Sequence, residues 1–176
     1  MAISDSDFRN ALSRLAGGVC IVATAAADGE RRGVTATAIC SVSASPPTVL
    51  ACVNISTGTC KMIEDTGRFS INLLGEQDRP IADTFAGRDG RSGSERFQVG
   101  DWLASPDTKM PILNDALATM ECRVSKVVHM GTHAVFFGEV DRIVNGDRAP
   151  LIYQGGSYRS LLLEPGTRMS PSEVPA

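Results

Sequence analysis

GVTATAICSVSASPP, at residues 33–47, alternates between apolar and hydroxyl-bearing side chains, with Ile39 as the one exception. A period of two is typical of a β-strand, because successive side chains point to opposite faces. We expect one strand that Pro46 and Pro47 stop, with its apolar face in the core. Short hydroxyls on the other face would let a flat ligand approach the backbone, although an ordinary half-exposed strand has the same pattern. The apolar face consists of Val34, Ala36, Ala38, Cys40, Val42 and Ala44.

Composition narrows the class of protein. The chain has 176 residues, 43% of them hydrophobic, so we expect one domain with one core. A net charge of −3 argues against binding to nucleic acid or to an anionic membrane surface. No signal peptide or membrane-spanning stretch is recognisable, so we expect a cytoplasmic protein. The 5 cysteines are widely spaced, which predicts reduced and mostly buried thiols and no zinc site.

Turn residues divide the chain into short strands and a few helices. Residues 4–16 have apolar side chains at helical spacing, and Gly17 and Gly18 would end that helix. The region between the expected helix at 76–85 and Pro111 is expected to be irregular. Short strands at fairly regular spacing predict a closed or partly closed antiparallel barrel. Strands are expected at residues 19–25, 48–54, 69–74, 118–130, 132–144, 151–153 and 157–163, and further helices within 54–66 and 76–85. This makes residues 1–163 a single domain, followed by a tail without fixed structure at 164–176.

Polar residues cluster where the helix within residues 54–66 would begin. A helix start offers free amide groups and a positive dipole end, both of which suit a phosphate. One hydroxyl that simply caps the helix would explain part of the same cluster. The glycine-rich loop at 85–97 carries arginines that could clamp a phosphate or remain ordinary surface charges. The cluster consists of Asn54, Ser56, Thr57, Thr59 and Lys61, and the arginines are Arg88, Arg91 and Arg96.

The remaining chemistry is sparse. His133 follows Gly131 and Thr132 at a predicted hairpin tip, where it would contact either solvent or a ligand. No Gly-x-Ser-x-Gly or Gly-x-Gly-x-x-Gly motif is present, so we expect neither a serine hydrolase nor a Rossmann domain. These parts together suit a planar ligand with a phosphate tail.

Several segments together resemble the short flavin reductases of two-component monooxygenases, most closely the reductase component of 4-hydroxyphenylacetate 3-monooxygenase. The resemblance covers roughly residues 8–163, with all segments in the same order. Where many of these reductases have Gly-Asp-His, this chain has Thr132 before His133, which removes a possible partner of the histidine. The matching segments are GVTATAICSVSASPP at 33–47, LACVNISTGT at 50–59, FAGRDG at 85–90, ERF at 95–97, GTH at 131–133, GEV at 138–140 and LIY at 151–153.

The resemblance implies a mainly β fold, the flavin-binding split β-barrel of Greek-key type with a few flanking helices, assembled as a homodimer. It implies that the flavin ring lies against the 35–38 segment, near the subunit interface. His133 would lie beside the nicotinamide, while Phe85 and Arg88 would close over the ligand. The implied flavin contacts are Thr35, Ala36, Thr37, Ala38, Ser41, Val53, Asn54, Thr57 and Thr59. The implied contacts of the reduced dinucleotide are Tyr153, Gly155 and Tyr158.

The implied reaction is hydride transfer from NADH or NADPH to FMN or FAD. The cofactors carry this chemistry, so the protein needs no acid–base pair, and His133 would orient the nicotinamide or relay a proton. Reduced flavin would then pass to a partner monooxygenase. Two other functions fit the same residues: a reductase with bound FMN that passes electrons to a cobalt corrinoid, and a barrel that binds flavin without catalysis.

Overall fold

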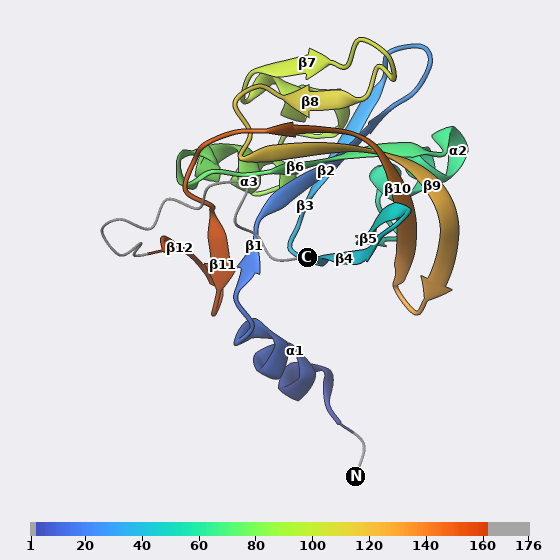
Figure 1. Ribbon diagram of the computed structural model, residues 1–176. Helices are drawn as coiled ribbons and strands as arrows, with labels where there is room; N and C mark the ends of the chain where they lie inside the picture. The colour runs from blue at the N-terminus through green and yellow to red at the C-terminus, as the bar shows by residue number, and fades with distance from the viewer. Residues whose placement is uncertain (1–2, 162–176) are drawn as a thin grey trace.

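The computed structural model describes residues 3–161 of the chain. Its main element is a seven-stranded sheet in the order β3-β2-β6-β9-β10-β5-β4 (Figure 1). All neighbouring strands in this sheet are antiparallel, so the predicted mainly β, antiparallel architecture is confirmed. The strands are β2 (Cys20–Ala25), β3 (Arg31–Ala36), β4 (Ile39–Ala44), β5 (Pro47–Asn54), β6 (Arg68–Leu73), β9 (Ala118–Met130) and β10 (His133–Asn145).

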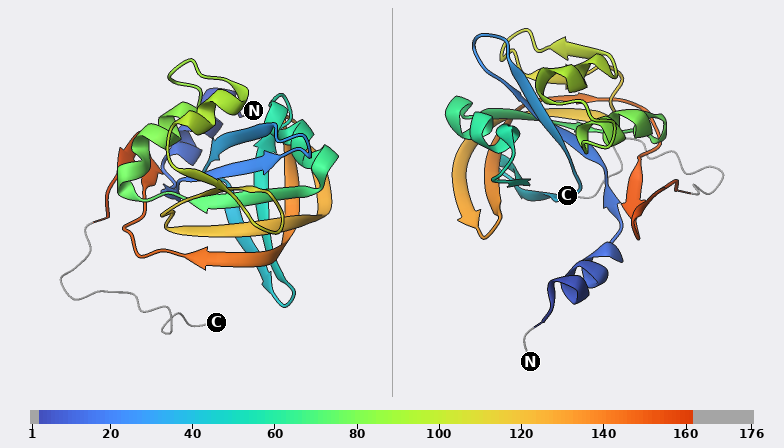
Figure 2. Two further views of the ribbon diagram at one scale, coloured as in Figure 1. Left: turned by 90° about the horizontal axis from the view of Figure 1, so that it is seen from above. Right: turned by 180° about the vertical axis from the view of Figure 1, so that it is seen from behind.

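Strands β3 and β4 are consecutive in the chain but form opposite edges of the sheet. Only Thr37 and Ala38 separate them, and three peptide steps reach at most about 11 Å. The sheet must therefore curl until its edges approach each other, as its wrapped strands in Figure 2 show. The amide of Cys52 in β5 donates to the carbonyl oxygen of Ala38 at 3.0 Å and holds this link. The result is the expected barrel, split between β3 and β4.

The prediction of one continuous strand through residues 33–45 is wrong. The segment changes partners at Thr37 and Ala38, because β3 pairs with β2 whereas β4 pairs with β5. The break also moves the apolar alternation by one residue. Ile39 packs against the barrel core, whereas Val42 is 47% exposed. Cys40 is exposed too, so the apolar face reaches the core only in the first half of the segment.

Strand β2 is buried on both faces and separates two apolar clusters. One cluster fills the barrel interior, where Cys20 and Val22 meet Phe69 and Phe136. The other lies on the opposite face of β2, beneath the helix α3 (Arg79–Phe85). This helix follows a short 3-10 turn, η1 (Glu76–Asp78), and carries Pro80 in its first turn, where the missing N–H of proline is tolerated. The second cluster consists of Val19, Ile21, Ala23, Leu74, Ile81, Ala82, Phe85, Phe97, Leu113, Ala116 and Leu151.

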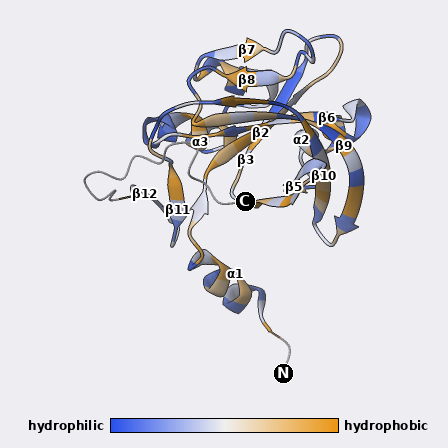
Figure 3. Cartoon of the chain, viewed as in Figure 1, coloured by the Kyte–Doolittle hydropathy of each residue, from blue (hydrophilic) through white to orange (hydrophobic). Residues whose placement is uncertain are grey.

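The two other predicted helices also form. In α1 (Asp5–Ser13), the hydroxyl of Ser4 caps the helix by accepting the amide of Asp7 at 3.1 Å. This helix projects away from the sheet (Figure 1), and its apolar side chains remain in contact with water. Phe8 is 58% and Leu12 is 55% exposed, and Figure 3 shows hydrophobic segments on this projecting helix. In contrast, α2 (Gly58–Thr66) packs its buried face against the barrel.

The long hairpin of β9 and β10 turns at Gly131 and Thr132, as predicted. The region before it is less irregular than expected. A small hairpin of β7 (Trp102–Ala104) and β8 (Pro111–Leu113) lies on the outside of the main sheet, after a second 3-10 segment, η2 (Gly93–Gln98). Strands of three residues are too short to produce a readable alternation in the sequence.

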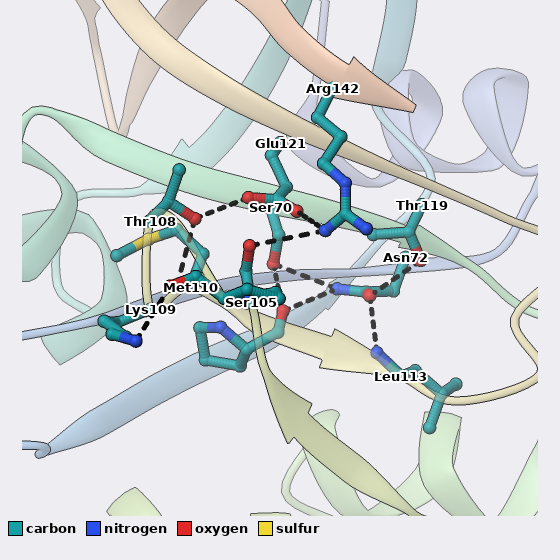
Figure 4. A network of polar contacts seen from close by, with 12 residues as sticks. Ser70, Asn72, Ser105, Thr108, Lys109, Met110, Leu113, Thr119, Glu121 and Arg142 are labelled. Atoms are coloured by element: carbon teal, nitrogen blue, oxygen red, sulfur yellow. Dashed lines mark hydrogen bonds and ion pairs between the residues drawn. The ribbon is translucent and has the colours of Figure 1, made fainter. Parts of the chain in front are cut away.

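A buried polar network anchors this small hairpin to the main sheet (Figure 4). The carboxylate of Glu121 in β9 is 1% exposed, and it accepts hydrogen bonds from Thr108 at 2.5 Å and Arg142 at 2.9 Å. The amide oxygen of Asn72 in β6 accepts the backbone N–H of Leu113 at 2.8 Å. Side chains of the sheet therefore satisfy polar groups of the hairpin, as buried polar groups require.

The predicted C-terminal strands are not part of the main sheet. Instead, β11 (Ile152–Gln154) and β12 (Ser157–Arg159) form a separate three-stranded sheet with β1 (Gly17–Gly18), the pair predicted only to end a helix. The last residues of the predicted strand at 157–163, and the predicted tail at 164–176, lie outside the described residues.

Cysteine burial follows the prediction in part. Cys20, Cys60 and Cys122 are buried, and all 5 thiols are free. Burial raises the pKa of Cys20 and of Cys122 to about 12, so both remain protonated thiols at neutral pH. Across residues 3–161, no helix has the length and apolar character that crossing a membrane requires.

Candidate functional site

Residues 32–37, in β3 and just after it, border two hollows on the protein surface. The first, which we call the tyrosine hollow, has a volume of about 210 Å³. The second, the arginine hollow, has a volume of about 350 Å³. The tyrosine hollow is lined by Val19, Thr35, Ala36, Thr37, Ala86, Arg88, Tyr153 and Tyr158. The arginine hollow is lined by Arg32, Gly33, Val34, Thr57, Gly58, Thr59, Gly93 and Arg96.

The tyrosine hollow brings together six of the site residues expected from the sequence, although they come from three separate parts of the chain. They are Thr35, Ala36, Thr37, Arg88, Tyr153 and Tyr158. The hydroxyl of Thr35 donates to the carbonyl oxygen of Ala82 at 2.7 Å, so it binds α3. Its proton is therefore not directed at a ligand, contrary to the expectation of a free hydroxyl face. The floor of the hollow consists of small side chains and backbone, which allow a flat molecule to approach closely.

A carboxylate of α3 organises the rim of the tyrosine hollow. Arg88 donates through Nη1 to Asp83 Oδ1 at 2.7 Å, and the hydroxyl of Tyr158 donates to the same oxygen at 3.0 Å. Tyr153 stacks edge-on against Tyr158, with ring centroids 5.3 Å apart. Partial burial, followed by the hydrogen bond to Asp83, raises the pKa of Tyr158 to about 12. At neutral pH the phenol therefore keeps its proton and remains a donor.

The arginine hollow contains the start of α2, where a phosphate site was expected. Thr57 caps this helix, because its hydroxyl accepts the amide of Cys60 at 3.2 Å and donates to the carbonyl oxygen of Asn54 at 2.8 Å. The simpler interpretation of that hydroxyl is therefore correct. Thr59 is buried, with 3% of its surface exposed, and lines the hollow. The helix thus supplies backbone N–H groups and its dipole rather than a row of free hydroxyls.

Two arginines face this helix start, and one of them was missed by sequence reasoning. Arg32 lies over Gly58 and forms an ion pair with Glu30. Arg96 donates through Nη1 to the carbonyl oxygens of Gly33 at 3.3 Å and Phe85 at 3.2 Å, and it forms no ion pair within residues 3–161. A guanidinium whose charge has no carboxylate partner favours an anion. Arg32 lies just outside the 33–47 motif, so its place beside the helix start could be found only from the folding of β3 against α2.

Two expected site residues are placed elsewhere. Phe85 is 1% exposed and packs edge-on against Phe97, with ring centroids 4.9 Å apart. Its ring belongs to the core and does not close over a ligand, so that expectation is wrong. Lys61 forms an ion pair with Asp65 at 2.7 Å, one helical turn away, and lines neither hollow. The helix spacing of four residues gives Lys61 a nearby carboxylate, which explains its orientation.

The remaining expected contacts lie around the hollows. Val53 is 1% exposed and belongs to the barrel core, so its side chain is not available to a ligand. Ser41 is exposed on β4, next to the split in the barrel. Asn54 ends β5 and accepts the amide of Ser56 through Oδ1 at 2.9 Å. Gly155 forms the turn between β11 and β12, and its amide donates to the carbonyl oxygen of Ser13 at 2.8 Å, which holds α1.

His133 begins β10 directly opposite Asn54, close to the start of α2. Its side chain is exposed and lines neither hollow. Nδ1 of His133 lies 2.9 Å from the hydroxyl of Thr132. The hydroxyl of Thr132 is therefore a partner for the His133 ring, although Thr132 replaces the aspartate that many similar reductases have there. The other histidine, His129, is engaged with Glu64 at 2.8 Å.

Comparison with known proteins assigns the family. The chain matches the model of the flavin reductase like domain over residues 12–162. It therefore belongs to the flavin reductase family, and with it to the flavin oxidoreductases, which confirms the resemblance inferred from the sequence.

Three relatives illustrate the similarity. FMN reductase (NADH) RutF of Pseudomonas syringae pv. syringae is 38% identical over 176 residues, which cover 99% of this chain and 92% of that protein. The 4-hydroxyphenylacetate 3-monooxygenase reductase component of Salmonella typhimurium is 38% identical over 158 residues, covering 89% and 92%. The solved structure of NADH:FAD oxidoreductase SgcE6 of Streptomyces globisporus C-1027 has a TM-score of 0.82 and 27% identity, covering 92% of this chain and 97% of that chain.

Proposed function

We propose that this protein is an NAD(P)H-dependent flavin reductase that supplies reduced FMN or FAD to a separate monooxygenase. Bound together, a flavin and a reduced nicotinamide supply the hydride-transfer chemistry. The observation that carries the proposal is the pair of hollows along β3, one floored by small side chains and one containing arginines and a helix start. The named functions of the relatives support the same activity.

A flavin would span the two hollows as one extended ligand. The ring would lie against residues 35–38, and the phosphate would lie at the start of α2, near Thr59, Arg32 and Arg96. From Val34 to Thr37, β3 and its end span roughly 10 Å, which a phosphorylated ribityl chain can bridge. The helix start and the two guanidinium groups favour a doubly charged phosphate.

The protein's own groups would bind and orient the reactants. Thr37 and Ala36 leave room for a ring to contact the backbone, so that two planar molecules can stack at reacting distance. Arg88 and Tyr158 offer donors to the reduced dinucleotide at the rim of the tyrosine hollow. His133, fixed through Nδ1 by Thr132, would orient the nicotinamide or relay a proton to solvent.

A homodimer is part of the proposal. The apolar face of α1 includes Phe8 and Leu12, which are 58% and 55% exposed, and Leu15 just after the helix is 73% exposed. Val42 on edge strand β4 is 47% exposed. A second copy of the chain would bury these side chains, since exposed apolar surface favours association. The buried free thiols are consistent with a reducing cytoplasm, where we place the protein.

The test is oxidation of NADH and NADPH in air by the purified protein, without flavin, with FMN and with FAD. Turnover that rises with added flavin and continues well past one equivalent would support a reductase that releases its product. Tight flavin binding with turnover only after a corrinoid is added would instead support electron transfer from a bound FMN. No reduction of bound flavin under any of these conditions would leave a non-catalytic binding barrel.

A further inference from the structure

Asp83 connects two elements that form the rim of the tyrosine hollow. It lies in α3, and its Oδ1 accepts hydrogen bonds from Arg88 at 2.7 Å and from Tyr158 in β12 at 3.0 Å. Its other oxygen lies 3.8 Å from Nε of Arg79. The guanidinium carbons of Arg79 and Arg88 lie 5.3 Å and 5.6 Å from the centre of the Tyr158 ring. One carboxylate thus holds three side chains together.

We propose that Asp83 is a positioning residue that fixes Arg88 and Tyr158 for the reduced dinucleotide, an inference that rests on the proposed reductase function. Asp83 itself does not line the hollow, whereas both of its hydrogen-bonding partners do. The phenol of Tyr158 remains a donor to Asp83 at neutral pH, because burial and this hydrogen bond raise its pKa. Asp83 also ties the small sheet to α3, which sets the width of the rim.

The charges around Asp83 allow two opposite effects of its removal. Asp83 is the carboxylate that forms ion pairs with both Arg79 and Arg88. If it only offset their charge, its loss would make the rim more positive and would improve binding of an anionic dinucleotide. If it positions them, its loss would release two long side chains and weaken that binding. The sign of the change in KM therefore distinguishes positioning from charge compensation.

The experiment compares Asp83→Ala and Asp83→Asn with the wild type. A matched control is Asp141→Ala, because Asp141 forms a similarly exposed ion pair with Arg68 at 3.0 Å, and neither residue lines the two hollows. We expect Asp83→Ala to raise the KM for NADH about fivefold, with kcat and the flavin Kd within about twofold. Asp83→Asn keeps one acceptor oxygen, so it should give a smaller rise. The control should leave all three parameters near wild type.

A KM for NADH that is unchanged or lowered in Asp83→Ala would overturn the positioning role. The role would also be overturned if KM rose by the same factor by which kcat and flavin affinity fell, together with a drop in thermal stability larger than that of the control. That pattern indicates a structural role only. Turnover by the wild type is measured in the same series. Failure of the proposed function would abolish wild-type turnover, whereas failure of the positioning role would leave wild-type turnover intact.

Discussion

Phe85 lies directly beneath Gly33, where a β-carbon would be 2.6 Å from Cε1 of the aromatic ring. Gly33 is the first residue of the 33–37 segment, which runs from the arginine hollow to the tyrosine hollow. Its carbonyl oxygen accepts a hydrogen bond from Arg96. The aromatic core therefore supports the floor of the candidate site through a contact that only glycine allows.

Gly33→Ala should destabilise the protein, because Phe85 is buried on all sides and its ring cannot move away freely. We expect a loss of roughly 1–3 kcal/mol in the free energy of unfolding, typical of overpacking. Urea denaturation measures it, with Gly18→Ala as control, since a β-carbon at Gly18 meets nothing within 4 Å. Equal stability of the two variants would contradict this account of Gly33.

Arg32→Ala should weaken FMN binding about tenfold, because it removes a charged donor beside the expected phosphate position. Lys61→Ala is the matched comparison. The sequence places Lys61 at the phosphate site, whereas in the structure it pairs with Asp65 outside both hollows. It should leave the FMN Kd within about twofold, as expected for an exposed ion pair. Fluorescence titration gives both constants. A larger effect of Lys61→Ala than of Arg32→Ala would place the phosphate elsewhere.

His133→Ala should impair use of the reduced dinucleotide more than flavin binding. Loss of one hydrogen bond to the nicotinamide should raise the KM for NADH about fivefold. His129→Ala is a natural control, because His129 lies on the same hairpin and its ring is engaged with Glu64 of α2. Steady-state kinetics and flavin titration on both variants decide the matter. Equal losses of NADH and flavin affinity in His133→Ala would argue against a role at the nicotinamide.

Tyr158 should make the free energy of unfolding fall as the pH rises above 10. Its pKa is raised from the ordinary 10 to about 12 in the folded protein, so its contribution is complete below pH 10 and is lost as pH rises toward 12. Cys20 and Cys122 act with the same sign, and the comparison must therefore be made between proteins that keep both thiols. Tyr158→Phe should lose less stability between pH 10 and 12 than the wild type in urea denaturation. Parallel curves for the two proteins would contradict the assigned pKa.

Glu121→Gln should destabilise the fold without altering the site. The buried carboxylate binds Thr108 and Arg142, and its neutralisation should cost roughly 1–3 kcal/mol. The exposed pair of Asp141 and Arg68 provides the contrast, since Asp141→Asn should cost less than about 1 kcal/mol. Chemical denaturation measures the loss of stability, and FMN titration shows whether the site is unaltered. A Glu121→Gln protein as stable as Asp141→Asn would show that the network of Figure 4 does not anchor the small hairpin.

Much of the fold could be predicted from local patterns. The β9–β10 hairpin has long alternating runs on either side of Gly131, and α1 has both a cap and an apolar stripe. The break at Thr37 was harder to find, because both halves of the segment alternate with the same period. Its one signal was Ile39, the apolar residue out of phase, which the structure explains by the change of partner strand.

The candidate site could be predicted only in part. Thr37, Tyr153 and Tyr158 line the same hollow, and the segments of Thr37 and Tyr153 carry readable motifs. Arg32 and Asp83 were missed, because they act through contacts between elements that are distant in sequence. Phe85 was misassigned for the opposite reason: its motif was readable, but burial beneath Gly33 depends on tertiary packing.

The most direct test of the central claim is a crystal structure of the protein with FMN bound. We predict that the ring lies against residues 35–38 in the tyrosine hollow and that the phosphate lies in the arginine hollow, within hydrogen-bonding distance of Arg32 or the amides that begin α2. A flavin bound with its phosphate beside Lys61, or with its ring away from β3, would contradict the claim that one ligand spans both hollows.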